Sequence, residues 1–305
     1  MRRNLGPIAG GIAVGVAILA LASWPIRAFQ VPSTEEQHLA QGKFLFTVVE
    51  SFDGKYLGDT PGHLGRAGDW AIIRLGTPGR LHAIDVDTGK GVWKRQIDPH
   101  HLSRLLGAPK IYDGVLYQPV SAMEEVAAAD ERYPCCTFRG NVVALDPATG
   151  RQLWRAYSIR EPNRPTRVSR AGTQQHAPAG GAMFNSPTID AKRGLLYVGT
   201  GDSYTDVDSD STNAVIAVRL RDGSRAWTHQ VLQNDAWLLM CDKNPHANCP
   251  KELGPDFDFA SSPVLARLAS GREIIVAGAK SGDVFAFDPD AKGKLLWRQH
   301  LVKGS

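Results

Sequence analysis

Apolar and polar residues alternate in short runs along the chain, and one pattern of runs recurs. Each copy begins with an alternating apolar strand that contains an alanine, continues through a polar turn with a glycine, and ends at a tryptophan. Alternation with a period of two predicts a β-strand, and Asp and Gly accept the backbone angles of a tight hairpin turn. The four copies are "RLHAIDVDTGKGVW", "NVVALDPATGRQLW", "AVIAVRLRDGSRAW" and "DVFAFDPDAKGKLLW", which end at Trp93, Trp154, Trp227 and Trp297.

A second hairpin precedes three of these copies, in "GAPKIYDGVLYQPV", "NSPTIDAKRGLLYVGTGD" and "SSPVLARLASGREIIVAG". Each repeat therefore predicts about four strands. One four-stranded sheet cannot bury both of its faces alone, whereas copies packed radially can. The sequence thus predicts an all-β fold, a β-propeller with four clear repeats and a degenerate fifth within residues 31–70. We expect the four tryptophans to pack between neighbouring blades.

Composition agrees with this fold class and excludes one kind of partner. The chain of 305 residues is 43% hydrophobic and contains 31 glycines and 19 prolines, as many short strands joined by turns require. The net charge is +4, and both signs are scattered along the chain without a basic stripe. We therefore expect no nucleic acid partner.

The first 30 residues are expected to lie outside the propeller domain, which would span residues 31–305. Arg2 and Arg3 precede an apolar run from about Gly6 to Trp24, and Ala20-Leu21-Ala22 offers a cleavage site. This pattern predicts a signal peptide, with an uncleaved N-terminal membrane anchor as the alternative. Either interpretation predicts export to the periplasm, free or anchored to the inner membrane, where disulfides persist.

The four cysteines form two pairs. Cys135 and Cys136 are adjacent, and their Cα atoms are expected about 3.8 Å apart, closer than the usual range of disulfides. A structural bond between them is predicted, with a redox role as the alternative. Cys241 and Cys249 bracket the insertion "DKNPHAN", which predicts a disulfide that closes this loop. Zinc binding together with His246 is the alternative.

The first two copies have the form A-x-D-x-x-T-G-x-x-x-W. Together the copies resemble the repeats of alcohol dehydrogenases that depend on pyrroloquinoline quinone (PQQ), in particular the polyvinyl-alcohol dehydrogenase branch. The stretches "PCCTFRGNVVALDPATG", "NSPTIDAKRGLLYVGTGDSYT" and "NCPKELGPDFDFASSPVLA" carry the resemblance in this order, and it covers roughly Asp69 to Lys303. It implies an eight-bladed propeller with PQQ and Ca²⁺ near its axis and an aspartate as the base. A separate cytochrome c is the implied electron acceptor, because the chain has no C-x-x-C-H haem motif.

The resemblance also implies the metal ligands and the base. Glu124 or Glu125 matches the family's calcium-binding glutamate, and Asp202 of "GTGD" stands where the family has an asparagine ligand. The catalytic aspartate is expected in "YTDVDSDSTN", where Asp208 fits best, also as a metal ligand, and Asp210 fits next. Solvated loop acids are the alternative for all of these residues.

Three further residues are implied as cofactor contacts. Lys280 of "AGAKSGDV" matches a lysine that contacts the quinone, and Arg139 of "FRG" could pair with a PQQ carboxylate. Phe184 of "GAMFNSPT" stands where the family stacks a tryptophan on the ring. We therefore expect Glu124, Asp202, Asp208 and Lys280 to gather around one axial pocket.

The resulting functional hypothesis is an exported PQQ-dependent dehydrogenase that oxidises a simple or a polymeric alcohol by hydride transfer with the help of calcium. A non-catalytic propeller scaffold of the cell envelope and a truncated inactive relative are the alternatives. Four or five blades cannot close an eight-bladed ring, so the sequence also predicts a partial chain, a partner chain that completes the propeller, or a smaller ring.

Overall fold

The computed structural model describes residues 47–50, 56–60, 70–75, 79–85, 88–207 and 209–304, with side chains from residue 79 onward. All of these residues belong to one compact unit, residues 42–305. The predicted leader at residues 1–30 and Asp208 lie outside the described residues. Within the described part of the chain, no helix combines the length and the apolar character needed to cross a bilayer.

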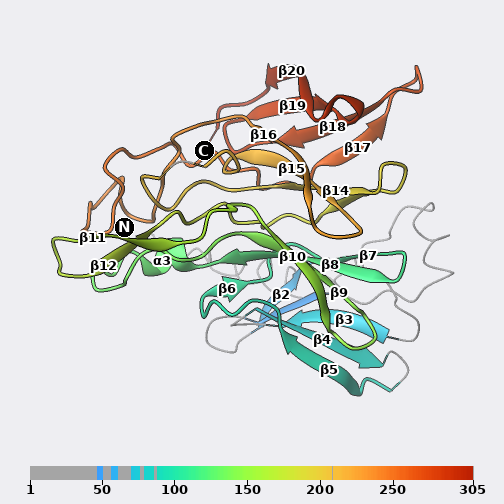
Figure 1. The fold of residues 1–305 in the computed structure, drawn as a ribbon, viewed down its shortest axis with the longest axis horizontal. Helices are drawn as coiled ribbons and strands as arrows, with labels where there is room; N and C mark the ends of the chain where they lie inside the picture. Colours follow the sequence, from blue (N-terminus) through green and yellow to red (C-terminus); the bar gives the residue numbers. More distant parts are fainter. Residues whose placement is uncertain are drawn as a thin grey trace, which may run out of the picture. The chain divides into compact units, whose positions relative to one another are not determined.

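The repeats form consecutive antiparallel sheets, as predicted (Figure 1). The first repeat contributes a three-stranded sheet of β3 (Trp70–Leu75), β4 (Arg80–Asp85) and β5 (Gly91–Gln96). The second contains β7 (Lys110–Tyr112), β8 (Val115–Ala122), β9 (Asn141–Leu145) and β10 (Gln152–Tyr157), and β6 (Ser103–Arg104) also pairs with β8.

The third and fourth repeats are four-stranded. Their strands are β13 (Thr188–Asp190), β14 (Leu195–Gly199), β15 (Ala214–Arg219) and β16 (Arg225–Gln230), then β17 (Val264–Arg267), β18 (Glu273–Gly278), β19 (Asp283–Asp288) and β20 (Lys294–His300). Two separate hairpins are β1 (Thr47–Glu50) with β2 (Tyr56–Thr60) and β11 (Arg164–Val168) with β12 (Gln174–Ala177). The helical elements are short: α3 (Glu124–Ala127) and η1 (Pro289–Ala291).

The repeated alanine and tryptophan are cross-strand partners in every copy. The pairs are Ala83 with Trp93, Ala144 with Trp154, Ala217 with Trp227 and Ala286 with Trp297. A register shift lies next to the pair in each hairpin, and the turn glycine has a φ between 68° and 73°. A small residue opposite the indole leaves room for it on the shared face, which explains why the two recur together.

Three of the four tryptophans, Trp93, Trp154 and Trp227, pack between consecutive sheets, as expected, whereas Trp297 is exposed within the described residues. Trp93 Nε1 donates to Pro147 O at 2.8 Å, and its ring covers the turn at Gly150 in the next sheet. Trp154 Nε1 donates to Leu220 O at 3.0 Å, and a Cβ placed on Gly223 would lie 2.5 Å from its ring. Each indole therefore fixes the hairpin turn of the following sheet at a distance that only glycine allows.

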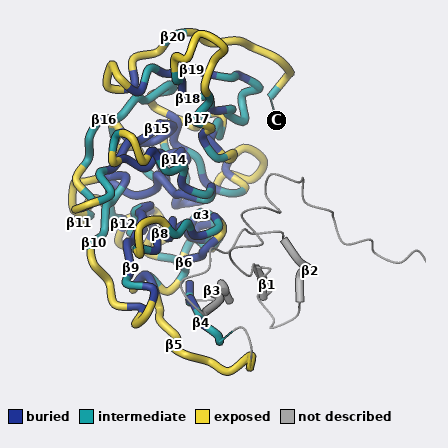
Figure 2. Tube along the Cα trace, turned by 90° about the vertical axis from the view of Figure 1, so that its right-hand side faces the viewer, coloured by how far each residue is buried: buried dark blue, intermediate teal, exposed yellow. Residues whose placement is uncertain are grey.

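The middle strands bury both faces, one against each neighbouring sheet. In β14, Leu196 and Val198 join a core with residues of the second sheet, whereas Leu195 and Tyr197 join a core with residues of the fourth. Strands β8, β9, β14 and β15 are buried, while β5 and β20 are exposed (Figure 2). This gradient confirms the propeller-type stacking predicted from the repeats.

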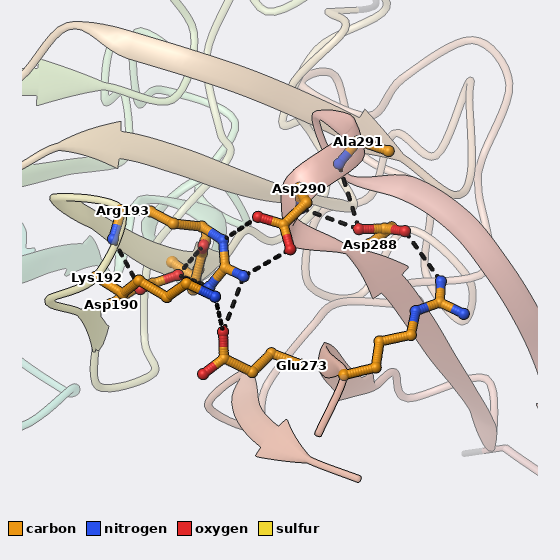
Figure 3. Close-up of polar contacts among 9 residues, drawn as sticks. Asp190, Lys192, Arg193, Glu273, Asp288, Asp290 and Ala291 are labelled. Carbon is orange, nitrogen blue, oxygen red and sulfur yellow. Dashed lines mark hydrogen bonds and ion pairs between the residues drawn. The ribbon is translucent and has the colours of Figure 1, made fainter. Parts of the chain in front are cut away.

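A partly buried arginine, Arg193, links the third and fourth sheets through ion pairs (Figure 3). Arg193 pairs with Asp190 at 2.7 Å, with Glu273 at 2.9 Å and with Asp290 at 2.8 Å. Its hydrogen bonds to these carboxylates raise the pKa of Arg193 above its ordinary value, against the effect of burial. Because the guanidinium pairs with carboxylates of both sheets, it contributes to their relative placement.

Candidate metal and cofactor site

Four carboxylates and one lysine come together where loops of the second, third and fourth repeats meet, and we call them the acid cluster: Glu125, Asp202, Asp256, Asp258 and Lys280. Glu125 lies on α3, Asp202 follows β14, and Asp256 and Asp258 precede β17. Lys280 lies in the turn between β18 and β19. Strand ends of different repeats therefore supply the members of the cluster.

Asp202 is the most deeply buried acid of the cluster, with an exposed fraction of 2%. Its backbone amide donates to Asp258 Oδ1 at 2.8 Å, while its own Oδ2 has no hydrogen-bond partner among the described residues. Burial, followed by the charges of Asp258 and Glu125, raises the pKa of Asp202 well above its ordinary value. A buried carboxylate oxygen without a partner lowers the stability of the fold unless a cation or a ligand binds to it.

Lys280 balances part of the negative charge. Its Nζ lies 2.7 Å from Asp256 Oδ1 and 2.5 Å from Asp258 Oδ2, and its amide donates to Asp258 O at 2.9 Å. Burial would lower the pKa of Lys280, but the two aspartates raise it above its ordinary value. The lysine is therefore a fixed cation at one side of the cluster.

Glu125 and Asp256 are less buried than Asp202, and both have raised pKa values. Burial and the charges of Asp258 and Asp256 raise the pKa of Glu125 to about 7, although Lys280 opposes the shift. Burial raises the pKa of Asp256 to about 6, with Lys280 opposing and Asp258 adding to the shift. Uncompensated like charges in a half-buried place are typical of metal-binding and catalytic acids.

Asp235 holds the loop that carries Asp256. Its Oδ1 accepts the amide of Asp256 at 3.0 Å, and its Oδ2 accepts the amide of Phe257 at 2.9 Å and a hydrogen bond from Asn213. Asp256 has a φ of 60°, a conformation that few residues other than glycine adopt without support. The buried carboxylate of Asp235 thus stabilises the strained backbone that positions Asp256.

Glycine is required beside Asp202. A Cβ on Gly201 would lie 2.8 Å from both Phe184 Cζ and Asp258 Oδ1. The bare backbone of Gly201 therefore lets the phenyl ring of Phe184, which is half-buried, approach the acid cluster. This places Phe184 next to the cluster, as a cofactor contact would need to be.

Asp202 and Lys280 lie close together, as the sequence predicted, but Glu124 is engaged elsewhere. Its Oε1 accepts the amide of Thr137 at 2.8 Å and the hydroxyl of Tyr133 at 2.9 Å, and its Oε2 accepts the amide of Phe138 at 2.7 Å. Burial would raise the pKa of Glu124, but His100 and the backbone amides lower it. Of the two glutamates that the sequence left open, Glu125 belongs to the acid cluster.

Two other predicted residues make contacts away from the cluster. Asp210 is exposed and pairs with Arg160 at 3.8 Å and Arg225 at 3.6 Å. Arg139 stacks over the ring of Tyr157, 4.1 Å from its centroid, and donates to the carbonyls of residues 159, 160 and 161. In this arrangement Arg139 supports a loop, and Asp210 belongs to a surface ion-pair group.

Sequence reasoning missed Asp256 and Asp258, although they lie in the quoted stretch "NCPKELGPDFDFASSPVLA". The insertion around Cys241 and Cys249 separates Asp256 and Asp258 from β16 in the sequence. The acids just before β15 therefore looked like the better candidates. The sequence feature that could have indicated them is a pair of acids, two residues apart, in the loop before the first strand of a repeat.

Both predicted disulfides are present. Cys135 bonds to Cys136 next to β12, where the amide of His176 donates to Cys135 O at 2.8 Å. Cys241 bonds to Cys249 with a Cα–Cα distance of 5.7 Å and closes the insertion. His246 Nε2 lies 3.4 Å from Cys241 Sγ, but disulfide sulfurs are not thiolates, so the bonded form does not supply the zinc site considered above.

The acid cluster suits a hard divalent cation. One oxygen each of Asp202, Asp256 and Asp258 lie within 4.8 Å of one another. When its four carboxylates are ionised, the cluster has three negative charges that Lys280 does not compensate. Carboxylate oxygens are the ligands that Ca²⁺ prefers. Oδ2 of Asp202 has no hydrogen-bond partner among the described residues and is available as a metal ligand. The residues present therefore fit such an ion.

Comparison with known proteins identifies the family. A model described as "PQQ: Glucose/ethanol/alcohol dehydrogenase, beta-propeller domain" matches residues 109–303. The chain is 41% identical over 223 residues to a polyvinylalcohol dehydrogenase of Pseudomonas sp, covering 73% of this chain and 35% of that protein. It is 40% identical over 225 residues to one of Sphingopyxis sp. (strain 113P3), covering 73% and 34%.

The fold has solved counterparts. The structure of quinohemoprotein alcohol dehydrogenase ADHIIG from Pseudomonas putida HK5 is similar with a TM-score of 0.58 and 23% identity, covering 79% of this chain and 34% of that one. The chain thus spans about a third of the length of the relatives that it matches. By its repeats, its stacked sheets and the match over residues 109–303, it belongs to the family of PQQ-dependent glucose, ethanol and alcohol dehydrogenases with a β-propeller domain.

Proposed function

We propose that the protein takes part in PQQ-dependent oxidation of an alcohol, with Ca²⁺ held at the acid cluster. The observation that carries this proposal is the free, buried Oδ2 of Asp202 beside the carboxylates of Asp256 and Asp258. A scaffold without a cofactor would gain nothing from buried acids with uncompensated charge, because they oppose folding. A metal site explains them.

In this proposal Asp202, Asp258 and Glu125 hold the calcium ion, and Phe184 and Lys280 contact the quinone. When bound, PQQ would supply the hydride acceptor for the alcohol, and Ca²⁺ would supply a Lewis acid that polarises the quinone. Lys280 supplies a fixed positive charge next to the site, which favours negative charge that develops there. Its contacts with Asp256 and Asp258 keep the ammonium in place before the reaction.

Asp256 is the proposed base. It is half-buried, and its pKa of about 6 leaves it ionised near neutral pH while keeping it basic enough to accept the hydroxyl proton. The hydrogen bond that its amide donates to Asp235 Oδ1 fixes its backbone, which limits the motion of the carboxylate. Asp208 lies outside the described residues and stays a competing prediction, whereas Asp210 is occupied by Arg160 and Arg225.

The proposed substrate is a polymeric secondary alcohol, because two relatives near 40% identity are named as polyvinylalcohol dehydrogenases. We also propose a separate cytochrome c as electron acceptor, which is supported by a Pseudomonas sp relative named "Lupanine 17-hydroxylase [cytochrome c]", 26% identical over 293 residues. Export to the periplasm is proposed from the charged and apolar pattern of residues 1–24 alone.

Reconstitution tests the proposal. The purified chain is titrated with PQQ in the presence of Ca²⁺ while tryptophan fluorescence is followed, and dye reduction is then measured with 2-propanol and with poly(vinyl alcohol). We expect saturable quenching that requires Ca²⁺, and dye reduction that requires both PQQ and alcohol. Absence of PQQ binding in the presence of Ca²⁺ would contradict the proposal.

A further inference from the structure

Two adjoining pockets form one groove beside the acid cluster. They have volumes of about 170 Å³ and about 270 Å³, and both are lined by Thr205, Asp206 and Lys251. The smaller pocket extends to Asn234 and Asp235, and the larger one extends to Cys135 and His176. Because they share one stretch of wall, we treat them as a continuous elongated depression and call it the polar groove.

The walls of the polar groove are well fixed. One wall is the segment after Asp202, and the other belongs to the insertion that the Cys241–Cys249 bond closes. The amide of Lys251 donates to Asp206 Oδ1 at 2.6 Å and joins the two walls. Asn248 Nδ2 anchors the insertion through the carbonyls of Ala128, Asp130 and Tyr133. The groove therefore has a defined shape before any ligand binds.

Three residues that line the larger pocket carry buried polar atoms without a partner among the described residues: Tyr204 Oη, Thr205 Oγ1 and His176 Nδ1. Tyr204 is only 1% exposed. Hydroxyl groups can both donate and accept, and imidazole can do either according to its tautomer. Groups of this kind, gathered around one pocket, suit a ligand whose own groups also donate and accept, as alcohols do.

The charges along the polar groove do not select an ionic ligand. Arg167 and Lys251 stand against Asp206, Asp235 and Glu252, so the two signs are nearly balanced. A site for a polyanion or a polycation would present an excess of one sign. The lining thus favours a neutral chain rich in hydroxyl groups.

The polar groove meets the acid cluster at two residues. Tyr204 lines the larger pocket and follows Asp202 by only two positions in the chain. Asp235 lines the smaller pocket and accepts the amide of Asp256. A chain that occupies the groove therefore passes next to the proposed base.

We propose that the polar groove binds successive hydroxyl groups of a linear polyhydroxylated alcohol while one carbinol of the same chain lies at the acid cluster. This inference deepens the proposed function and rests on it for the reaction, although binding of the polymer can be measured without any reaction. Tyr204, Thr205 and His176 supply the hydrogen bonds, and the length of the groove selects chains over small alcohols.

The test uses T205W to fill the groove and T205V to remove one hydroxyl. T228V is the matched control, because Thr228 Oγ1 is also buried without a partner but Thr228 lies on β16 and lines neither pocket. KM is measured for poly(vinyl alcohol) and for 2-propanol. We expect T205W to raise the KM for the polymer about tenfold and T205V about threefold, with the KM for 2-propanol within about twofold. T228V should match the wild type.

A second readout separates this inference from the proposed function. Without PQQ, the wild type and T228V should be retarded in native gels that contain poly(vinyl alcohol), and T205W should migrate as in a gel without polymer. If poly(vinyl alcohol) retards the wild type and T228V but not T205W, and PQQ does not activate the protein, the groove is supported and the proposed function is rejected. An active enzyme in which both Thr205 variants keep the wild-type KM for polymer and the wild-type retardation would overturn the groove. If T205W has a lowered Tm, K251W takes its place as the filling variant.

Discussion

The amide of Asp202 donates a hydrogen bond of 2.8 Å to Oδ1 of Asp258, although 56 residues separate the two positions. This bond joins the segment after β14 to the loop before β17. The carboxylate of Asp258 thereby helps to position Asp202. It also uses Oδ1 of Asp258, while Oδ2 of Asp202 has no hydrogen-bond partner within the part of the chain that the structure describes. The acid cluster is therefore assembled by the backbone and leaves oxygen ligands available for a cation.

The first prediction concerns this free oxygen. D202N replaces one charged ligand by a weaker neutral one of nearly the same shape, so Ca²⁺ affinity should fall by about tenfold or more. Binding is measured on the protein without PQQ, by calorimetry or by terbium luminescence. D222N is the control, because Asp222 is an exposed turn residue paired with Arg221. Equal calcium affinity of D202N and the wild type would show that the charge of Asp202 does not contribute to calcium binding.

The second prediction distinguishes the candidate bases. D256N should lower kcat by about a hundredfold or more while the protein still binds PQQ, because the amide cannot accept the proton. D210N should stay within about twofold of the wild type, since Asp210 lies on the surface with Arg160 and Arg225. Steady-state kinetics and PQQ titration of D256N, D210N and D208N decide the question. A large loss of kcat in D208N with little change in D256N would restore the assignment made from the sequence.

The repeat could be predicted because its signal is local. The Ala–turn–Gly–Trp pattern lies within about 15 residues, and cross-strand pairing such as Ala144 with Trp154 enforces it in every copy. The stacking of sheets followed from the same pattern, since both faces of a middle strand such as β14 are apolar. These features need no knowledge of distant residues.

The site was only partly predictable, because its geometry depends on distant segments. Asp202 and Lys280 follow strands whose ends are fixed by the repeat, so the sequence placed them correctly side by side. Glu124 and Glu125 could not be separated in sequence, because adjacent side chains on a helical turn point about 100° apart. Asp256 and Asp258 reach the cluster only after the insertion folds back, and no local pattern reveals that return.

The third prediction concerns the turn glycines that contact tryptophan. G223A adds a Cβ at a φ of 73° and at 2.5 Å from the ring of Trp154. G271A is the matched control, because Gly271 has a φ of 81° with no atom near the added Cβ. We expect G271A to lower the free energy of unfolding by about 1 kcal/mol and G223A by about 2–4 kcal/mol. Equal losses in urea titrations would mean that the indole contact contributes little.

The fourth prediction concerns acid stability. Hydrogen bonds from Arg298 and from Ser281 and His300 lower the pKa of Asp283 to about 2. Because the folded-state pKa lies below the ordinary value of about 3.9, the carboxylate stabilises the fold above that value, and the contribution is lost as the pH falls toward 2. The Tm difference between the wild type and D283N should therefore be large at pH 6 and shrink at about pH 2–3. A difference that is independent of pH would contradict this assignment.

The fifth prediction compares the two tryptophans of the third and fourth repeats. Trp227 is 8% exposed and covers the turn at Gly293, whereas Trp297 is 44% exposed within the described residues. W227A should therefore cost about 3–5 kcal/mol of unfolding free energy, and W297A should cost less than about 1.5 kcal/mol, because a half-exposed indole loses less packing. Both are measured by urea unfolding at several protein concentrations. A cost of W297A that approaches that of W227A, and that grows with protein concentration, would show that another copy of the chain covers Trp297. That outcome would support the partner chain predicted from the number of repeats.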